Sequence, residues 1–158
     1  MVNDPDQPRA CPVAVEQELD IVEQKMRERG YRWTSQRRLI ASEALSNHSH
    51  FTADQLLELC LLRDQGVSRA TVYRTLGMLE NAGFVEGLDT GDGGRKFEHT
   101  LGHEHHDHMI CTACGKIIEF HDAALEERQK LAAIESDFEI ESHSLKLFGK
   151  CKNCRSDA

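Results

Sequence analysis

The sequence predicts an α+β protein, in which an N-terminal winged helix-turn-helix domain precedes a C-terminal α/β domain with a four-cysteine zinc site. The first half contains four segments whose apolar residues recur at helical spacing. Two strand-like segments then flank a glycine-rich turn at residues 90–94, which is typical of a β-hairpin. Two Cys-x-x-Cys pairs follow, Cys111 with Cys114 and Cys151 with Cys154, and four thiols in two close pairs suit tetrahedral zinc.

The N-terminal part of the chain divides into a polar arm and four predicted helices. Residues 1–14 contain prolines among polar residues, which favours a disordered arm. Thr52 with Gln55 three residues later is a capping-box pattern, and Ser68 precedes the last apolar stripe as an N-cap. Helices are expected over residues 15–30, 34–47, 52–64 and 68–83.

The fourth predicted helix has two different faces. Val72, Leu76 and Leu79 share an apolar stripe, whereas Tyr73 and Arg74 lie on the other face. Two helices joined by a tight turn, the second of which exposes Tyr and Arg, match a helix-turn-helix that enters a DNA major groove.

The pattern changes to strands after the fourth helix. A hairpin of residues 84–88 and 95–99 would complete a winged helix, which we expect to span residues 15–89 with a hinge at 90–100. Residues 101–158 are expected to form a small α/β dimerisation domain, because so thin a core calls for zinc and a second copy of the chain. Its elements are predicted as strands at 106–110, 116–120 and 138–148 and a helix at 122–135.

Charge is unevenly distributed along the chain. The formal net charge is −8, of which residues 1–23 carry −5, residues 24–89 carry +1 and residues 90–158 carry −4. The middle segment is thus slightly positive and could contact a phosphate backbone. The negative charge of the other segments opposes non-specific binding to nucleic acid. Its clustered arginines are Arg27, Arg29, Arg32, Arg37 and Arg38.

Cysteine usage and hydropathy indicate the compartment. No apolar run approaches the ~20 residues that span a bilayer, and the N-terminus lacks the layout of a secretory signal, so we expect a cytoplasmic protein without a membrane partner. In a reducing cytosol, paired Cys-x-x-Cys units more often bind zinc than form disulfides. A redox disulfide or exposed thiols are the alternatives.

The spacing of the cysteines sets one structural requirement. Between Cys114 and Cys151 lie 36 residues, and an antiparallel sheet would bring the two pairs together. Cys60 lies on the apolar face of the third predicted helix and is expected in the core. Cys11 lies in the predicted arm and has no expected role.

Four histidines lie within six residues just before the first cysteine pair. Side chains alternate between the faces of a strand, so this cluster is expected to supply two metal sites. One would join His106 and His108 to Glu119, Glu98 and His50. The other would join His105 and Asp107 to Glu126 and His143. The remaining histidines, His48, His99, His103 and His121, are expected to be surface or satisfied residues.

From about Glu16 to Cys154 the chain resembles the ferric uptake regulator family. The resemblance rests on the recognition segment Ala70-Thr-Val-Tyr-Arg74, the His105-His-Asp-His108 motif, the Cys111-x-x-Cys114-Gly-Lys segment followed by Ile118-Glu-Phe120, and His143-Ser-Leu-x-Leu-x-Gly149. It implies a homodimeric, metal-dependent transcriptional repressor that binds double-stranded operator DNA and no small organic ligand.

The same resemblance implies roles for the ligand sets. Structural zinc would be held by Cys111, Cys114, Cys151 and Cys154. The sensing site would comprise His50, Glu98, His106, His108 and Glu119, and the auxiliary site His105, Asp107, Glu126 and His143.

The resemblance also bears on the sensed metal. Zinc-sensing members place a cysteine in the sensing site. In this chain no cysteine is available for that site except the structural four. Peroxide-sensing members have a similar set but favour aspartate where this chain has Glu98 and Glu119. The chain also resembles the iron-sensing branch at Tyr73-Arg74 of the recognition segment and at the basic residue Arg32. We therefore expect Fe²⁺ to be the corepressor for iron-uptake genes, with Mn²⁺ or Zn²⁺ able to substitute. A peroxide-sensing or a manganese- or zinc-sensing regulator is the alternative.

The DNA contacts are expected on the recognition helix. Tyr73 would contact a thymine methyl or a phosphate, and Arg74 a base edge or a phosphate. Arg95 and Lys96 of the wing either add phosphate contacts or are solvated turn charges. Further contacts are expected from Ser68, Arg69 and Thr71 and, by the resemblance, from Arg32.

Two other classes of protein fit the sequence less well. A zinc-dependent hydrolase needs an open coordination position, a general base and a substrate cleft, whereas the metal-binding residues here already supply four or five protein ligands for each ion. The chain is therefore not expected to be an enzyme. A zinc-stabilised interaction or metal-storage module would have no use for the helix-turn-helix segment.

Overall fold

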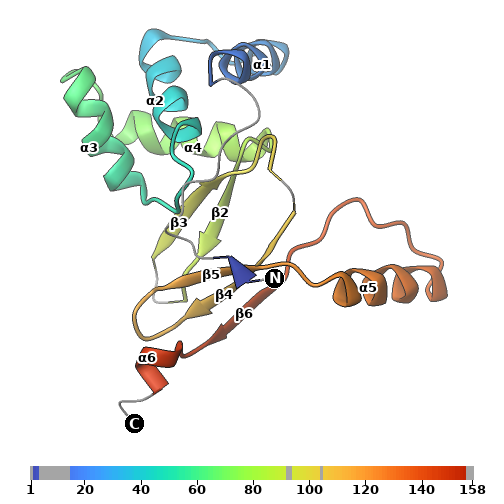
Figure 1. Ribbon diagram of the computed structural model, residues 1–158. Helices are drawn as coiled ribbons and strands as arrows, with labels where there is room; N and C mark the ends of the chain where they lie inside the picture. The colour runs from blue at the N-terminus through green and yellow to red at the C-terminus, as the bar shows by residue number, and fades with distance from the viewer. Residues whose placement is uncertain (1, 4–14, 92–93, 104, 156–158) are drawn as a thin grey trace. The chain divides into compact units, whose positions relative to one another are not determined.

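The computed structural model describes residues 2–3, 15–91, 94–103 and 105–155 (Figure 1). Its contacts cluster into two compact units. We call Asp6–Glu104 the helical unit, and His105–Ala158 together with Met1–Pro5 the sheet unit. The predicted arm lies outside the described residues except for Val2 and Asn3, and so does Cys11. In the described ranges, no helix is long and apolar enough to cross a membrane.

Four capped helices form most of the helical unit. Thr34, Thr52 and Ser68 each accept an N-cap bond from the backbone three residues further on. Thr52 and Gln55 form the predicted capping box. The helices are α1 (Val15–Glu28), α2 (Ser35–Leu45), α3 (Ala53–Arg63) and α4 (Arg69–Asn81), which confirms the four predicted segments.

The apolar stripes of these helices meet in one hydrophobic core. Val72, Leu76 and Leu79 of α4 are buried there, as their spacing predicts. Cys60 of α3 is also a core residue, and its burial raises the pKa of the thiol to about 11. The thiol therefore stays protonated near neutral pH and behaves as a small apolar side chain.

A hairpin completes the winged-helix arrangement. Strands β2 (Val85–Asp89) and β3 (Arg95–His99) pair antiparallel, with Val85 opposite His99. Phe51 and Phe97 exchange two backbone hydrogen bonds of 2.9 and 2.7 Å. This bridge places the segment that precedes α3 beside β3. Of the predicted turn, residues 92–93 lie outside the described residues.

The sheet unit is built on four strands in the order β1-β5-β4-β6. β4 and β5 pair antiparallel, whereas β6 pairs with β4 in parallel. β1 adds to the edge at β5, in a segment where the sequence predicted only an arm. The strands are β1 (Val2–Asn3), β4 (Asp107–Cys111), β5 (Ile117–Phe120) and β6 (Lys146–Gly149), and the helices are α5 (Ala123–Glu135) and α6 (Lys152–Arg155).

The last predicted strand is wrong over most of its length. Residues 138–145 form no strand, and only the end of the predicted range belongs to β6. Phe138 and Ile140 are 68% and 37% exposed, so the apolar residues here belong to the surface of the single chain rather than to its sheet. The short α6 was not predicted, because four residues are too few to show helical periodicity.

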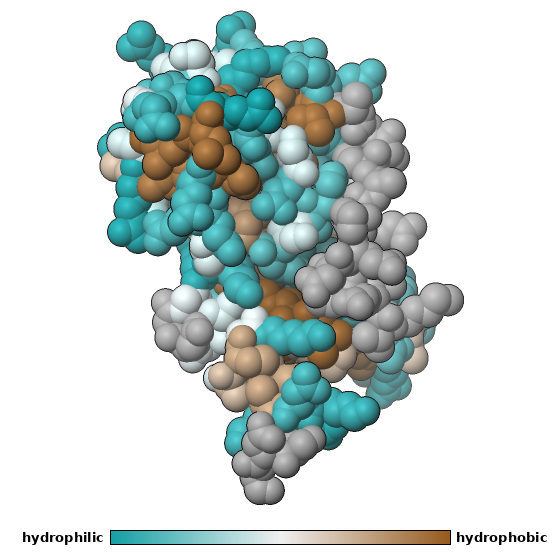
Figure 2. Space-filling view, turned by 60° about the vertical axis from the view of Figure 1, so that its left-hand side comes forward, coloured by the Kyte–Doolittle hydropathy of each residue, from teal (hydrophilic) through white to brown (hydrophobic). Residues whose placement is uncertain are grey.

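Much apolar surface of the sheet unit is exposed in the single chain. α5 has no buried residue, and Figure 1 shows it projecting from its own sheet. Figure 2 shows hydrophobic surface on both units. Exposed apolar surface beyond scattered single residues is typical of protein–protein contact. The exposed large apolar side chains of the sheet unit are Leu125, Leu131, Ile134, Phe138, Ile140, Leu147 and Phe148.

Candidate metal centres and nucleic-acid interface

The four paired cysteines come together at one edge of the sheet. Their ligand atoms all lie within 4.8 Å of one another, and the sulfur atoms of Cys114 and Cys151 are 3.8 Å apart. The expected antiparallel closure is wrong: β4 and β6 run parallel, with Cys111 opposite Gly149, so both Cys-x-x-Cys pairs follow strand ends at the same edge. Four thiols at such distances fit a tetrahedral zinc ion.

Backbone amides in this cluster favour the thiolate that a metal requires. The amide of Cys151 donates to Sγ of Cys111 at 3.3 Å. This hydrogen bond is the main reason why the pKa of Cys111 falls to about 6. Hydrogen bonds from the Cys154 segment likewise lower the pKa of Cys151. Because the thiolate is the metal ligand, these bonds prepare Cys111 and Cys151 for zinc, whereas hydrogen bonds with Cys151 and Cys114 raise the pKa of Cys154 in the metal-free cluster.

A second cluster joins α5, β4 and the segment before β6 within the sheet unit. Nε2 of His105 lies 3.3 Å from Oδ1 of Asp107 and 3.6 Å from Oε1 of Glu126. Nε2 of His143 lies 3.1 Å from the same glutamate oxygen. The N-cap Asp122 starts α5 and so positions Glu126 in its first turn. These residues are the set that the sequence assigned to the auxiliary site.

The predicted sensing residues are divided between the two units. In the helical unit, Nε2 of His50 lies 3.3 Å from Oε2 of Glu98, and both side chains are nearly buried. In the sheet unit, Nε2 of His106 lies 3.9 Å from Oε1 of Glu119, and the rings of His106 and His108 are 4.9 Å apart. His108 faces Glu119 across the β4–β5 pair. Each unit thus gathers imidazole and carboxylate ligands of its own.

A third histidine cluster was missed by sequence reasoning. His48, His99 and His103 place ligand nitrogens within 4.8 Å of one another inside the helical unit. His99 is buried rather than on the surface, and its burial, with the neighbouring imidazoles, lowers its pKa to about 4. His48 is far from the other two in the sequence, and only the Phe51–Phe97 bridge shows that they meet. His121 is exposed, as expected.

Helix α4, the predicted recognition helix, exposes the residues predicted for DNA contact. Tyr73 is 47% exposed, and Arg74 is exposed beside it. The guanidinium of Arg69 lies 5.5 Å from the Tyr73 ring centre and 2.9 Å from a carboxylate oxygen of Asp54. Arg69 is therefore held over the aromatic ring on the exposed face of the helix.

Two of the predicted DNA contacts also have a structural task. The Ser68 hydroxyl caps α4 by accepting from the amide of Thr71, and the two hydroxyl oxygens are 2.9 Å apart. Removing either hydroxyl would therefore disturb the start of the recognition helix as well as any contact with a phosphate. Arg32 is exposed in the loop before α2.

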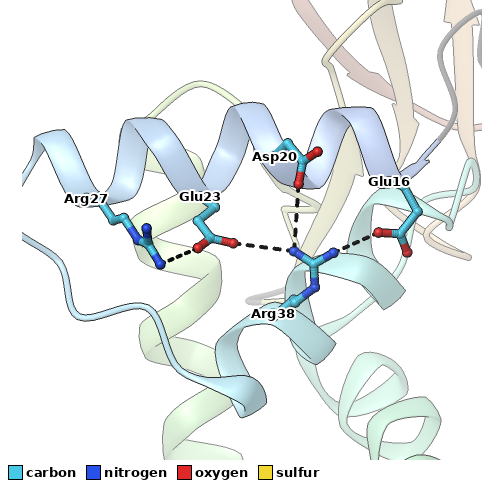
Figure 3. Close-up of polar contacts among 5 residues, drawn as sticks. All are labelled: Glu16, Asp20, Glu23, Arg27 and Arg38. Carbon is cyan, nitrogen blue, oxygen red and sulfur yellow. Dashed lines mark hydrogen bonds and ion pairs between the residues drawn. The ribbon is translucent and has the colours of Figure 1, made fainter.

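Two of the clustered arginines form ion pairs with carboxylates, so less positive charge is available for DNA than their number suggests. Figure 3 shows Arg38 of α2 facing α1, where it lies 2.7 Å from Glu16, 3.4 Å from Glu23 and 4.0 Å from Asp20. Arg27 lies 2.5 Å from the same Glu23. These carboxylates neutralise both arginines.

Other arginines that were expected to face DNA also form contacts within the helical unit. Arg29 donates to the carbonyl of Asn81 at 2.6 Å, and Arg37 donates to the carbonyl of Arg32. Arg95 of the wing is paired with Glu80 of α4, which supports its interpretation as a structural charge. A carbonyl oxygen carries no net charge, so Arg29 and Arg37 keep their positive charge, whereas Glu80 compensates that of Arg95.

Comparisons with known proteins agree with this arrangement. The model of the "Ferric uptake regulator family" matches residues 28–148. The peroxide-responsive repressor PerR of Staphylococcus epidermidis is 34% identical over 144 residues, which cover 91% of this chain and 95% of that protein. The ferric uptake regulation protein of Campylobacter upsaliensis is 38% identical over 143 residues, covering 87% of this chain and 91% of that protein.

A similar solved structure is that of the Helicobacter pylori ferric uptake regulator Fur, described as revealing three functional metal binding sites. It has a TM-score of 0.81 and 31% sequence identity, and the match covers 93% of this chain and 97% of that one.

Proposed function

Since the chain belongs to the ferric uptake regulator family, we propose that it is a homodimeric repressor of iron-uptake genes that binds operator DNA when Fe²⁺ occupies its sensing site. The family assignment makes it a metal-dependent transcriptional regulator and not an enzyme. The four-cysteine cluster is its structural zinc site, and the sensing and auxiliary sets of histidines and carboxylates are regulatory metal sites of the kind typical of the family.

The donor atoms of the sensing set carry the proposal of iron. His50, Glu98, His106, His108 and Glu119 offer only nitrogen and oxygen. Such ligands suit Fe²⁺ and Mn²⁺, whereas soft thiolates select zinc. Zinc would still bind these ligands more tightly by the Irving–Williams order, so the choice of iron depends on the concentrations of free metal in the cell.

The switch in this proposal is an ion that takes ligands from both units. His50 and Glu98 belong to the helical unit, and His106, His108 and Glu119 belong to the sheet unit. One ion bound by all five would fix the angle between the two units. Two recognition helices read successive half-sites only at a separation of roughly 34–36 Å. Fe²⁺ would shift the population toward that spacing, by no more than its differential affinity for the two states.

Dimerisation through the sheet unit is supported by its surface. Proteins of this family bind operator DNA as dimers. In this chain the apolar side chains of α5, of the segment after it and of β6 are exposed, including Ile134, Phe138 and Phe148. A second copy that covers these residues would supply the core that the sheet unit lacks.

The auxiliary set of His105, Asp107, Glu126 and His143 has a separate role in this proposal. Its members come from β4 and the residues just before it, from α5 and from the segment before β6, and all belong to the sheet unit. An ion here would fasten α5 to the sheet. It would therefore stabilise the dimerisation surface without itself changing the angle between the units.

DNA recognition would use α4, whose exposed face carries Arg69, Tyr73 and Arg74. A tyrosine ring suits a thymine methyl group, and an arginine suits a guanine edge or a phosphate. Ser68, Thr71 and Arg32 would add backbone contacts that set the register.

Peroxide sensing is the second candidate, and the peroxide-responsive relative of Staphylococcus epidermidis favours it. The glutamates at 98 and 119 oppose it, because the peroxide-sensing branch favours aspartate there.

One experiment separates the two candidates. Fluorescence anisotropy would follow binding of the zinc-loaded protein to a palindromic AT-rich operator during anaerobic titration with Fe²⁺ and, separately, with Mn²⁺. The iron-loaded complex is then exposed to low peroxide. Iron-induced binding that survives peroxide is expected for an iron-uptake repressor. Binding that Mn²⁺ supports, and that peroxide destroys in the iron form, would move the chain to the peroxide-sensing branch.

A further inference from the structure

Three histidines of the helical unit form a cluster that the proposed function does not use. His48 lies between α2 and α3, His99 ends β3, and His103 follows in the next turn. The Phe51–Phe97 bridge brings the first of these segments to the other two. The ring centres of His99 and His103 are 5.0 Å apart, and His48 lies 5.7 Å from the first and 5.5 Å from the second.

The rings meet at an angle rather than in a stack. His99 and His103 are inclined by 85° and His48 and His103 by 61°, so in each pair the edge of one ring faces the other ring. One nitrogen from each ring lies within 4.8 Å of the others. Three nitrogens bound at about 2.0–2.1 Å to one tetrahedral ion are roughly 3.4 Å apart. A modest contraction of the cluster would therefore complete a coordination set.

Some ring nitrogens of this cluster have no hydrogen bond to a residue that the structure describes. Among the described residues, no hydrogen bond reaches Nδ1 of His48 or either ring nitrogen of His99, although these atoms are buried. Buried polar atoms in folded proteins normally have a partner. Two imidazoles with such nitrogens, converging with a third, are typical of a site for zinc or another ion that favours nitrogen ligands.

A carboxylate beside the cluster supplies the countercharge. Oε2 of Glu18, on α1, lies 3.5 Å from Nε2 of His99, and both side chains are fully buried. A divalent ion held by three neutral imidazoles would bring uncompensated charge into the protein, and a buried carboxylate offsets it. Carboxylates commonly orient metal-binding imidazoles in the same way.

We propose that His48, His99 and His103, assisted by Glu18, bind a divalent transition-metal ion such as Zn²⁺ within the helical unit. This centre is distinct from the cysteine, sensing and auxiliary sets, and it does not depend on which metal the sensing set uses. The ion would connect the α2–α3 loop, the end of the wing and α1. It would therefore stabilise the winged helix itself rather than change its relation to the sheet unit.

Metal stoichiometry tests this centre directly. The full-length protein and its variants are dialysed against buffered Zn²⁺, and zinc per chain is measured by atomic emission. His48→Gln and His103→Gln are chosen because these side chains are less buried than His99 and glutamine keeps polarity. Each is expected to bind one zinc fewer per chain than the wild type. Circular dichroism verifies the fold of each variant, and either one that folds decides the question.

A variant of the auxiliary set is the matched control. His143→Gln removes an imidazole from a different unit, and we expect it to lose its own ion while keeping the new one. The double variant His48→Gln/His143→Gln should then lose two. If a helical-unit variant that folds binds as much zinc as the wild type, the proposal is overturned, whatever His143→Gln does.

Hydrogen exchange gives a second, independent result. In the wild type, added Zn²⁺ should slow amide exchange around residue 48 and at residues 99–103. The same slowing should be lost in His48→Gln but preserved in His143→Gln. Equal slowing in the wild type and in His48→Gln would contradict the proposal.

Discussion

The helical unit and the sheet unit differ in what holds each of them together. Residues from all four helices, joined by Phe84, Val85 and Phe97, pack into one buried cluster in the helical unit. Among the described apolar side chains of the sheet unit, only Ile110, Cys111 and Ile117 are buried. The first unit therefore contains its own source of stability. The second has to obtain part of its stability from metal ions and from a partner surface.

This difference separates two kinds of metal dependence. Thiolates at a sheet edge replace a missing core, so their ion is needed for the fold. The imidazoles and carboxylates of the proposed sensing set lie on elements that are already formed, so we expect their ion to bind and leave as a signal. The following predictions test that separation, beginning with the largest effect.

Loss of the zinc site should unfold one unit and leave the other. In Cys114→Ser the sheet unit loses a structural zinc, which typically contributes about 10–16 kcal/mol of apparent binding free energy, more than most domains have to spare. Hydrogen exchange should then lose protection in residues 105–155 but keep it in α1 to α4. A chelator should have the same effect, reversed by added zinc.

The matched control for this prediction is Thr112→Ser in the same Cys-x-x-Cys pair. It retains the hydroxyl that bonds to the carbonyl of Gly149 at 3.2 Å and is expected to stay folded. Simultaneous loss of protection in both units of Cys114→Ser would show that the helical unit is not self-sufficient.

A cavity in the helical core should destabilise the helical unit and leave the sheet unit with its zinc. Leu76 is 1% exposed, and Leu76→Ala should lower the free energy of unfolding of the helical unit by about 2–5 kcal/mol. Urea denaturation followed by circular dichroism measures the loss, and zinc content should stay unchanged. Leu62→Ala is the control, since Leu62 is 81% exposed and should change stability by no more than about 0.5 kcal/mol. Similar losses in both variants would disprove the assignment of the core.

Removal of a sensing ligand should affect regulation and not folding. Allosteric coupling is typically about 1–3 kcal/mol, or roughly 5–150-fold in affinity. In His108→Ala we expect the ratio of operator affinities with and without Fe²⁺ to fall to about one, with the zinc content and fold preserved. His121→Ala, at an exposed histidine in the loop after β5, should keep the wild-type ratio. Undiminished iron dependence in His108→Ala would exclude this histidine from the sensing site.

The smallest effect concerns which arginines face DNA. Arg74→Gln should reduce the slope of log K against log salt by about 0.9 for each phosphate that the variant no longer neutralises. Arg38→Gln should leave that slope unchanged, because Arg38 is neutralised by α1, and should cost no more than about 1 kcal/mol of stability. Anisotropy at several salt concentrations measures both. An equal reduction for Arg38→Gln would mean that the ion pairs with α1 open on DNA.

Local signals were sufficient to predict the helical unit. The capping residues Thr52 and Ser68 and the stripe of Val72, Leu76 and Leu79 specify helices through neighbours a few residues away, and the structure confirms them. The strand prediction failed over residues 138–145. Apolar side chains that are exposed for contact with a partner have the same sequence pattern as those of a buried strand. A single chain carries no signal that separates these two environments.

Long-range pairing was the main limit for the sites. The residues around β4 could be divided into two sets because strand alternation is local. The parallel partner of β4 depends on how the chain returns after α5, and the sequence does not indicate that path. The same limit concealed the cluster of His48, His99 and His103, which exists only because Phe51 pairs with Phe97.

The position of the second cysteine pair in the sequence also imposes an order of events on synthesis. The zinc site needs Cys154, whereas the helical core is complete by Leu101. At about 5–20 residues per second, the ribosome takes roughly 3–11 s to make the residues in between. During that interval a nascent chain has the means to fold its winged helix before it can close its zinc site or meet a second copy. The order of translation therefore separates the appearance of a DNA-reading surface from the appearance of its control.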